Sequence, residues 1–326
     1  MQRKLVIDMK FMLNNIAPST KDFSFRALNN LDEKDALVIH NPPDACCESP
    51  VLIRSTIPLS DHISYIQENN IKKAIIVADN ISFVEQCKSL EYIWAIPPIS
   101  SEILDYSPLY TLPHLHWFRC TLDSIHVCPI AFERLSKLSY LSVTGWTSDM
   151  NIGYLNCLKT LYLDSTKTNV QNLDFLRGAN SLENLVISDS SILSLSGIEH
   201  ASNLKRFELS YNRKLSDISQ LAELKDTLVW LDIENCNNIV DYSVLASLRN
   251  LELLRLSGTK NLPSIEFIES MPNLKCLVIS MNIVDGQLGY IKEIPYVSIK
   301  NRKHYTHKDK DFSKNTPFPL FISAYN

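Results

Sequence analysis

Histidine and cysteine residues gather in one stretch of the sequence, where side chains of these types could bind a zinc ion. The residues concerned are His114, His116, Cys120, His126 and Cys128. Imidazole nitrogen and thiolate sulfur are donors that zinc prefers. Their spacing matches no standard zinc module, however, and the hydrophobic pattern predicts that Cys120 is buried. We therefore predict no metal site.

Carboxylates that could act as catalytic acids or bases show no catalytic spacing. The sequence has no glycine before Gly145, and it contains no Gly-rich phosphate loop, no G-x-S-x-G elbow and no H-E-x-x-H motif. The sequence therefore predicts a protein that is not an enzyme, with no cofactor and no small-molecule substrate. One alternative stays open, an enzyme with its site in the N-terminal part, where the available carboxylates are Asp8, Asp44, Glu48 and Asp79.

An apolar frame of the form L-x-x-L-x-L recurs through most of the chain at intervals of 20 to 24 residues. The windows start at Leu115, Leu138, Leu158, Leu182, Leu204, Leu228, Leu251, Leu274 and Ile294. Every frame position is apolar if Cys120 is counted as apolar. A period of this length is typical of a solenoid, in which each repeat stacks on the next.

The elements of one repeat follow from this frame. Alternate side chains of a short strand face opposite ways, so the frame residues point inward and the x residues point outward. Successive strands then form a parallel sheet about 4.8 Å apart, and the looser apolar segments that return to the next strand suit 3₁₀ turns. Three residues after each frame, small polar groups could satisfy backbone amides, at positions 123, 146, 166, 190, 212, 236, 259 and 282. Trp146 is the exception to this rule.

Composition indicates a water-soluble globular chain with an uneven charge. Apolar residues make up 45%, charged residues 21%, and the net charge is −4. Between Lys300 and Lys314, six basic residues oppose two acidic ones, so this tail is basic and the rest of the chain is acidic. An acidic body argues against nucleic-acid binding. We predict a solvated tail, with contact to nucleic acid or a phosphorylated partner as the alternative.

The localisation predicted from the sequence is cytoplasmic. Asp8 and Lys10 interrupt the apolar stretch near the N-terminus, so no secretory signal is expected. No apolar run has membrane-spanning length, so we expect no membrane association. The eight cysteines follow no disulfide-scaffold spacing, which favours a reducing compartment.

Three segments are expected along the chain. Residues 1–110 show strand-like runs at 36–39, 51–53, 74–77 and 93–96, with helical stretches at 60–69 and after Ser82. This alternation predicts an irregular α/β module that caps the first edge of the solenoid. Residues 111–300 form the solenoid, and residues 301–326 form a C-terminal tail or cap. The predicted fold class is thus α/β, with a parallel concave β-sheet and short 3₁₀ or irregular convex segments.

The repeat resembles the short bacterial leucine-rich repeat of roughly 22 residues, as found in internalins and phosphatase-regulator-type repeat proteins. Residues 204–212 and 215–221 match it best, and the resemblance covers roughly residues 115–300. It is specific for fold and says little about function. The cytosolic setting and the irregular repeats are similar to the repeat-type immunity proteins of bacterial polymorphic toxin systems.

Two groups of outward-facing residues are candidates for binding a partner. Trp, Tyr and Arg dominate the binding energy of protein interfaces, and an exposed Trp on a sheet has no stabilising reason to be there. The alternative is that they are ordinary solvated strand residues and that Trp117 packs against the N-terminal module. The first group is Trp117, Arg119, Tyr140 and Tyr162, with Asp164 beside it; the second is Arg206, Glu208, Trp230, Asp232, Glu234 and Arg255.

The sequence thus predicts a non-catalytic solenoid that holds a protein partner on its concave face. The narrower hypothesis is an immunity protein that neutralises a cognate bacterial toxin. Trp230 would be the anchor, and Glu208, Asp232 and Glu234 would meet basic groups of the toxin. The alternative is an intracellular scaffold or regulator of an enzyme such as a phosphatase.

Overall fold

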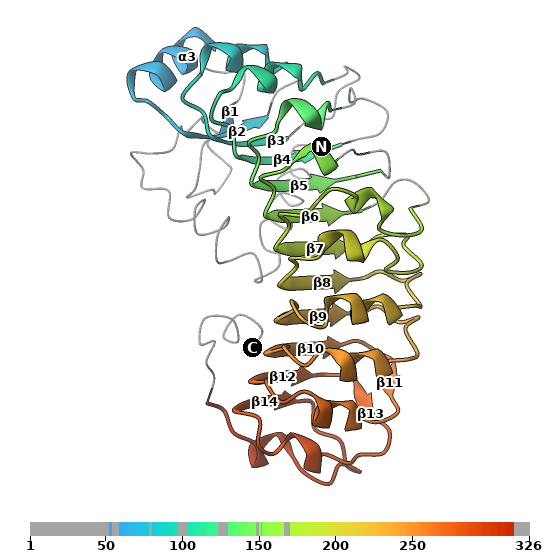
Figure 1. The fold of residues 1–326 in the computed structure, drawn as a ribbon. Coiled ribbons are helices and arrows are strands. Elements are labelled where there is room, and N and C mark those ends of the chain that lie inside the picture. The colour runs from blue at the N-terminus through green and yellow to red at the C-terminus, as the bar shows by residue number, and fades with distance from the viewer. Residues whose placement is uncertain are drawn as a thin grey trace. The chain divides into compact units, whose positions relative to one another are not determined.

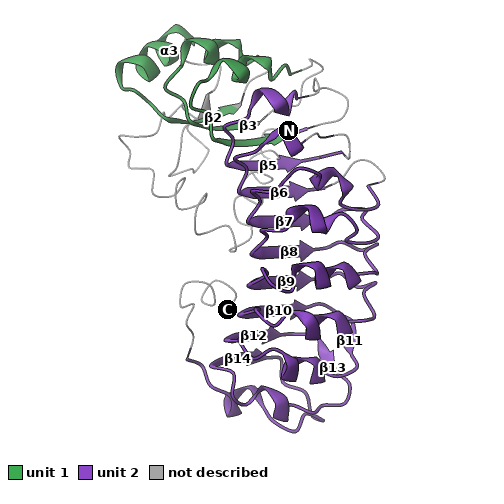
Figure 2. Ribbon diagram, viewed as in Figure 1, with its two compact units in different colours: residues 1–121, 125–129, 318–326 green, residues 122–124, 130–317 purple. Residues whose placement is uncertain are grey.

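The chain divides into two compact units in the computed structural model (Figure 2). Unit 1 comprises residues 1–121, 125–129 and 318–326, and unit 2 comprises residues 122–124 and 130–317. The structure describes residues 52–53, 59–77, 80–96, 104–122, 130–147, 150, 152–165 and 170–315. The boundaries expected from the sequence, at residues 110 and 300, stay predictions.

Unit 1 alternates strands with helical segments. Its strands are parallel and ordered β1, β2, β3, β4, and Ile66 of the helix is buried, as are Ile71 and Ile93. The predicted strand and helix alternation is confirmed for the described residues, except that the helix after Ser82 is a 3₁₀ helix. The elements are β1 (Leu52–Ile53), α3 (Leu59–Glu68), β2 (Lys73–Val77), η2 (Ser82–Gln86), β3 (Tyr92–Ile96), η3 (Ser107–Thr111) and β4 (Trp117–Thr121).

Unit 2 is a stack of coils, each with one short strand (Figure 1). Neighbouring strands are parallel and in register from coil to coil, as in the pairs Leu185↔Phe207 and Phe207↔Leu231. The strands are β5 (Tyr140–Thr144), β6 (Thr160–Asp164), β7 (Asn184–Ser188), β8 (Arg206–Ser210), β9 (Trp230–Glu234), β10 (Leu253–Ser257), β12 (Cys276–Ile279) and β14 (Tyr296–Ile299). A second, two-stranded sheet pairs β11 (Asn261–Leu262) with β13 (Asn282–Ile283).

The frame residues form the core of unit 2, as their spacing predicts. Leu161, Leu185, Phe207 and Leu231 occupy the same frame position on successive strands, and all are fully buried. Each such side chain contributes about 1.5–3 kcal/mol of transfer free energy. Because the side-chain period of a strand is two residues, this burial also fixes which residues face outward.

Every coil returns through a 3₁₀ turn on the side away from the strands (Figure 1). Turns of neighbouring coils contact one another and bury apolar residues such as Leu176, Ile198 and Leu221. They form a second layer over the core. The turns are η4 (Phe132–Arg134), η5 (Ile152–Tyr154), η6 (Asp174–Leu176), η7 (Ile198–Ala201), η8 (Ser219–Leu224), η9 (Ser243–Ser247), η10 (Glu266–Ser270) and η11 (Gly289–Ile291).

Residues with a left-handed backbone conformation follow several strands. Ser165, Asp189, Tyr211 and Asn235 follow β6, β7, β8 and β9 directly, and each has a φ between 46° and 56°. This conformation suits Asn, Asp and Gly better than Ser or Tyr. It turns the chain out of the sheet at the same point of each coil.

The predicted polar cap positions are confirmed in the middle of unit 2. The amide nitrogen of Asn212 donates to the Ile187 carbonyl at 2.8 Å, and its carbonyl oxygen accepts from the Ser190 backbone amide at 3.0 Å. Cys236 repeats the arrangement one coil later, since its thiol donates to the Leu209 carbonyl at 3.7 Å. Trp146 is fully buried and packs against Phe175, with ring centroids 4.8 Å apart. Positions 123 and 166 lie outside the described residues.

The basic tail folds onto the last coil up to residue 315. Tyr305 and Phe312 are buried, Lys314 forms an isolated bridge with Tyr296, and η12 spans Asp309–Asp311. The charged residues of this segment stay exposed or half-buried, in keeping with the prediction of a solvated segment, while the two buried aromatic residues anchor it to the last coil. Residues 316–326 of the predicted tail or cap lie outside the described residues.

Among the described helices, none combines the length and the apolar character that crossing a bilayer requires. The α-helix within the described residues, α3, has ten residues.

Candidate functional site

Three neighbouring strands bring the second predicted group of residues together. β8 supplies Arg206 and Glu208, β9 supplies Trp230, Asp232 and Glu234, and β10 supplies Arg255. The parallel register places Arg206 opposite Trp230, Glu208 opposite Asp232, and Asp232 opposite Arg255. All six residues occupy outward positions, because their sequence neighbours Phe207, Leu231, Ile233 and Leu254 are buried. We call these six residues the Trp230 cluster.

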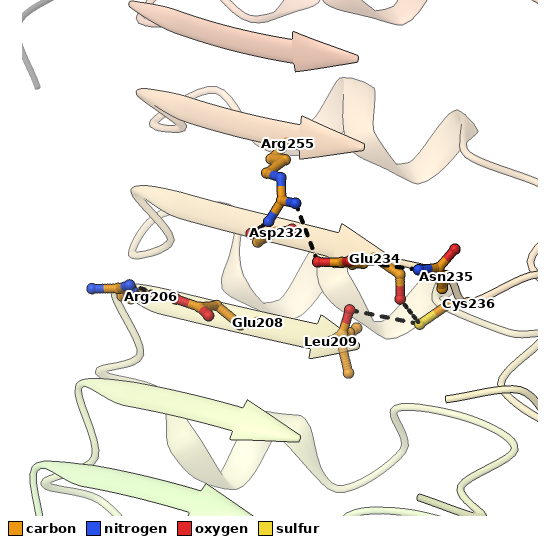
Figure 3. A network of polar contacts seen from close by, with 8 residues as sticks. All are labelled: Arg206, Glu208, Leu209, Asp232, Glu234, Asn235, Cys236 and Arg255. Carbon is orange, nitrogen blue, oxygen red and sulfur yellow. Dashed lines mark hydrogen bonds and ion pairs between the residues drawn. The ribbon is translucent and has the colours of Figure 1, made fainter. Parts of the chain in front are cut away.

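Ion pairs within and between the strands connect the charges of this cluster (Figure 3). Arg255 donates from Nη1 to Asp232 Oδ2 at 2.8 Å and from Nη2 to Glu234 Oε2 at 3.2 Å. Arg206 donates from Nε to Glu208 Oε1 at 2.6 Å on its own strand. Charge-assisted contacts of this kind fix side-chain rotamers, so the surface is ordered before any partner arrives.

Trp230 lies under one of these arginines. The Arg206 guanidinium carbon is 4.1 Å from the centroid of the Trp230 ring, a cation–π arrangement. Trp230 is half-buried, so it is less exposed than the sequence analysis assumed. The ring nevertheless keeps an accessible part on a surface of charged groups.

Two carboxylates of the cluster are buried, which corrects the expectation of an open acidic face. Glu208 and Asp232 are each only 5% exposed. Both lie on outward positions as the register requires, but Arg206 on the same strand pairs with Glu208 and Arg255 on the next strand pairs with Asp232. Glu234 is the most accessible acid, with 28% of its side chain exposed. The carboxylates are therefore engaged mainly by the protein's own arginines.

Burial raises the pKa of Asp232 to about 7. Desolvation of the charged form is the largest cause, and the nearby carboxylates of Glu208 and Glu234 raise the pKa further, while the Arg255 guanidinium lowers it. Asp232 Oδ1 is buried and accepts no hydrogen bond from the part of the chain that the structure describes. Burial therefore favours the protonated form of Asp232 relative to an exposed aspartate.

The first predicted group is divided between the units, so its members are described separately. In unit 1, Trp117 is 4% exposed and lies 6.5 Å from the Tyr92 ring, and Arg119 lies 4.5 Å from the Trp94 ring. In unit 2, Tyr140 is 7% exposed. The expectation that Trp117 and Tyr140 form an exposed aromatic patch is wrong, because both side chains are packed within the fold.

Tyr162 and Asp164 lie on outward positions of β6 and are half-buried. Asp164 accepts a hydrogen bond from Ser165 Oγ at 3.3 Å. These two residues stay accessible to a partner, though they form no part of the Trp230 cluster.

The zinc ligands considered from the sequence do not assemble among the described residues. No group of three or more His, Cys, Asp or Glu side chains is placed to hold a metal ion in that part of the chain. Cys120 is buried, and burial raises the pKa of its thiol strongly. His126 and Cys128 lie outside the described residues, as do Asp8, Asp44, Glu48 and Asp79.

A basic cavity at the C-terminal end of unit 2 was not predicted from the sequence. Lys300, Arg302, Lys303 and His304 line it from one side. Their density in the tail was noted, but nothing in the sequence showed that the tail folds back to form a cavity wall.

A parallel sheet in register, inward leucines and 3₁₀ returns together define the leucine-rich-repeat fold. The structures similar to this chain include an internalin from Listeria monocytogenes, with 19% identity over 72% of this chain and 69% of that chain and a TM-score of 0.52. TLR13 in complex with the RNA ssRNA13 is also similar, with 14% identity over 79% of this chain and 47% of that chain and a TM-score of 0.51. At these identities the likeness concerns the fold. No protein-family model matches the sequence, and no curated protein does.

Proposed function

We propose that this chain is a non-catalytic protein-binding solenoid that holds its partner on the outward face of β8, β9 and β10. The observation that carries the proposal is the Trp230 cluster itself. A partly accessible tryptophan is held by a guanidinium 4.1 Å away, on a surface already ordered by ion pairs. Tryptophan and arginine are the residues that most often dominate interface binding energy.

The ion pairs that order the Trp230 cluster lower the entropic cost of binding a partner. Immobilising a flexible side chain at an interface costs about 0.5–1.5 kcal/mol, and here Arg206 and Arg255 are restrained before binding. The partner would therefore bind to a preformed surface, and the binding free energy would come from burying the Trp230 ring. Because Glu208 and Asp232 are buried, Glu234, with 28% of its side chain exposed, is the acid best placed to meet a basic group.

The narrower proposal is that the partner is a cognate bacterial toxin and that this chain is its cytoplasmic immunity protein. The support is the resemblance of its irregular repeats to repeat-type immunity proteins. The alternative is a scaffold or regulator of an intracellular enzyme such as a phosphatase, which would use the same face. The RNA in the TLR13 structure belongs to that protein, and the acidic balance of this chain favours a protein partner.

Co-expression with the product of the adjacent upstream gene tests the toxin proposal. We expect this chain to co-purify with that product and to restore growth to cells that the product alone inhibits. Trp230→Ala should abolish rescue. Tyr154→Ala is the matched control, since Tyr154 is an aromatic residue, 54% exposed, on η5 away from the strands. Equal rescue by both variants would refute the site. Co-purification without any growth inhibition by the partner would favour the scaffold instead.

A further inference from the structure

A polar cavity of about 570 Å³ lies where β10, β12 and β14 end. This volume is within the range of pockets that bind small molecules. Its lining combines cationic, hydroxyl and amide side chains, and no carboxylate of the described residues is among them. The lining residues are Gly258, Thr259, Asn261, Ser280, Asn282, Lys300, Arg302, Lys303 and His304.

The cations of this cavity have no acidic partner among the described residues, in contrast to several other lysines of unit 2. Lys205 pairs with Glu183, Lys275 with Glu252 and Lys314 with Asp309. Lys300, Arg302 and Lys303 form no ion pair with any residue that the structure describes. Arg302 Nε is buried and donates no hydrogen bond within the same residues. A buried unsatisfied donor on a cation is costly unless an anion or other acceptor meets it.

The segment that carries these cations is held in place by hydrogen bonds within itself and to β13. Lys308 Nζ donates to the Arg302 carbonyl at 2.6 Å and to the Tyr305 carbonyl at 3.1 Å. Tyr305 Oη accepts from the Ile283 backbone amide at 2.8 Å, and His304 Nε2 lies 2.8 Å from the Ile283 carbonyl. The cavity wall is therefore preformed, as a binding site requires.

Gly286 allows this close approach. A Cβ at position 286 would lie 2.8 Å from the His304 carbonyl oxygen, closer than packed atoms tolerate. The φ of Gly286 is +64°, which other residues adopt at a cost. Glycine at position 286 thus allows the segment that carries the cations to pack against β13.

The arrangement of the cations favours the binding of a compact dianion over the binding of an extended polyanion. Three cations around one hollow favour a group with two negative charges. A nucleic acid needs a stripe of cations along its backbone, whereas the equivalent outward positions of earlier strands are Ser257, Glu234 and Ser210. The hydroxyl and amide groups of Thr259, Ser280 and Asn282 suit ligand hydroxyls.

We infer that this cavity binds a small phosphate monoester whose remaining part carries hydroxyl groups. Lys300, Arg302 and Lys303 hold the phosphate, and the polar side chains of β11, β13 and Ser280, which follows β12, contact the remainder. The inference is independent of the Trp230 cluster and of any protein partner.

Isothermal titration of the full chain with glucose 6-phosphate, inorganic phosphate and glucose tests the site. We expect saturable binding of one glucose 6-phosphate per chain, weaker binding of phosphate and none of glucose. Lys300→Ala and Lys303→Ala should each weaken glucose 6-phosphate binding at least tenfold. Both lysines are exposed, so these variants should fold, and Arg302→Gln should abolish binding.

Lys260→Ala is the matched control. Lys260 is an exposed lysine between two lining residues but does not itself line the cavity. Its loss should change the dissociation constant less than twofold. Absence of glucose 6-phosphate binding would overturn the inference, as would equal weakening by Lys260→Ala. Tighter binding of a single-stranded oligonucleotide, lost in the same lysine variants, would overturn it in favour of a nucleic-acid site.

Discussion

At the scale of residues, Arg255 is the cation on which the Trp230 cluster depends. It pairs with Asp232 and Glu234 across two strands. Arg255→Ala would leave the buried Asp232 without its cation, and we expect a loss of about 3–5 kcal/mol in the free energy of unfolding. Urea denaturation at pH 8 measures it. Lys275→Ala is the control: its pair with Glu252 is 45% and 32% exposed, so the loss should be below about 1 kcal/mol. Equal losses in the free energy of unfolding for Arg255→Ala and Lys275→Ala would show that Asp232 is not effectively buried.

Asp232 should also make stability depend on pH. Its pKa in the folded chain is raised to about 7, above the usual value near 3.9. The folded state therefore holds a proton that the unfolded state releases, and stability falls as pH rises from about 4 to 7. Asp232→Asn removes this titration. We expect the stability of the native chain relative to Asp232→Asn to decrease by at least about 1 kcal/mol between pH 5 and pH 8, measured by urea denaturation. An unchanged or increasing difference would contradict the raised pKa.

At the scale of elements, the coils are linked by Asn212. Its side chain is fully buried and bonds to Ile187 and Ser190 of the preceding coil. Asn212→Ala leaves those backbone groups unsatisfied, and we expect a loss of about 2–4 kcal/mol. Asn203→Ala is the control, since the Asn203 amide also reaches back one coil, to Asn180, but is exposed. Thermal unfolding of both variants measures the difference. A loss for Asn212→Ala no greater than for Asn203→Ala would show that the buried bonds do not join the coils.

The left-handed strand ends allow a stabilising change. Tyr211 is 44% exposed and has a φ of 56°. Glycine adopts this conformation without strain, so Tyr211→Gly should raise the free energy of unfolding by up to about 1 kcal/mol. The matched change Tyr154→Gly, in a 3₁₀ turn without positive φ, should lower it. Destabilisation by Tyr211→Gly would indicate that its side chain packs more than its exposure suggests.

The elements also show what a sequence can predict about this chain. Periodic leucines determined the strands, their register and the inward face, because burial has the period of the strand. The same rule assigned Asp232 and Glu208 to the outward face correctly but could not show that they are covered. Whether an outward carboxylate is buried depends on the rotamers of long side chains on neighbouring strands, such as Arg255 beside Asp232. The local spacing of residues in the sequence contains no signal for those rotamers. The C-terminal cavity was missed for the same reason.

At the scale of the whole molecule, charge is distributed unevenly. The chain carries a net charge of −4, yet cations without acidic partners collect at the end of unit 2, while acids at the Trp230 cluster are paired. Long-range attraction therefore contributes less to the proposed partner binding than burial of the Trp230 ring. Raising the salt concentration from 50 to 500 mM should weaken partner binding by less than about tenfold, measured by isothermal titration. A loss of several hundredfold would indicate an interface dominated by open charges.

The affinity of the partner for single-residue variants tests the central claim most directly. We expect Trp230→Ala to raise the dissociation constant at least about thirtyfold, equivalent to about 2 kcal/mol, and Tyr154→Ala to leave it unchanged within about twofold. If Trp230→Ala binds as tightly as the native chain, or if Tyr154→Ala weakens binding more, the partner does not occupy the outward face of β8, β9 and β10.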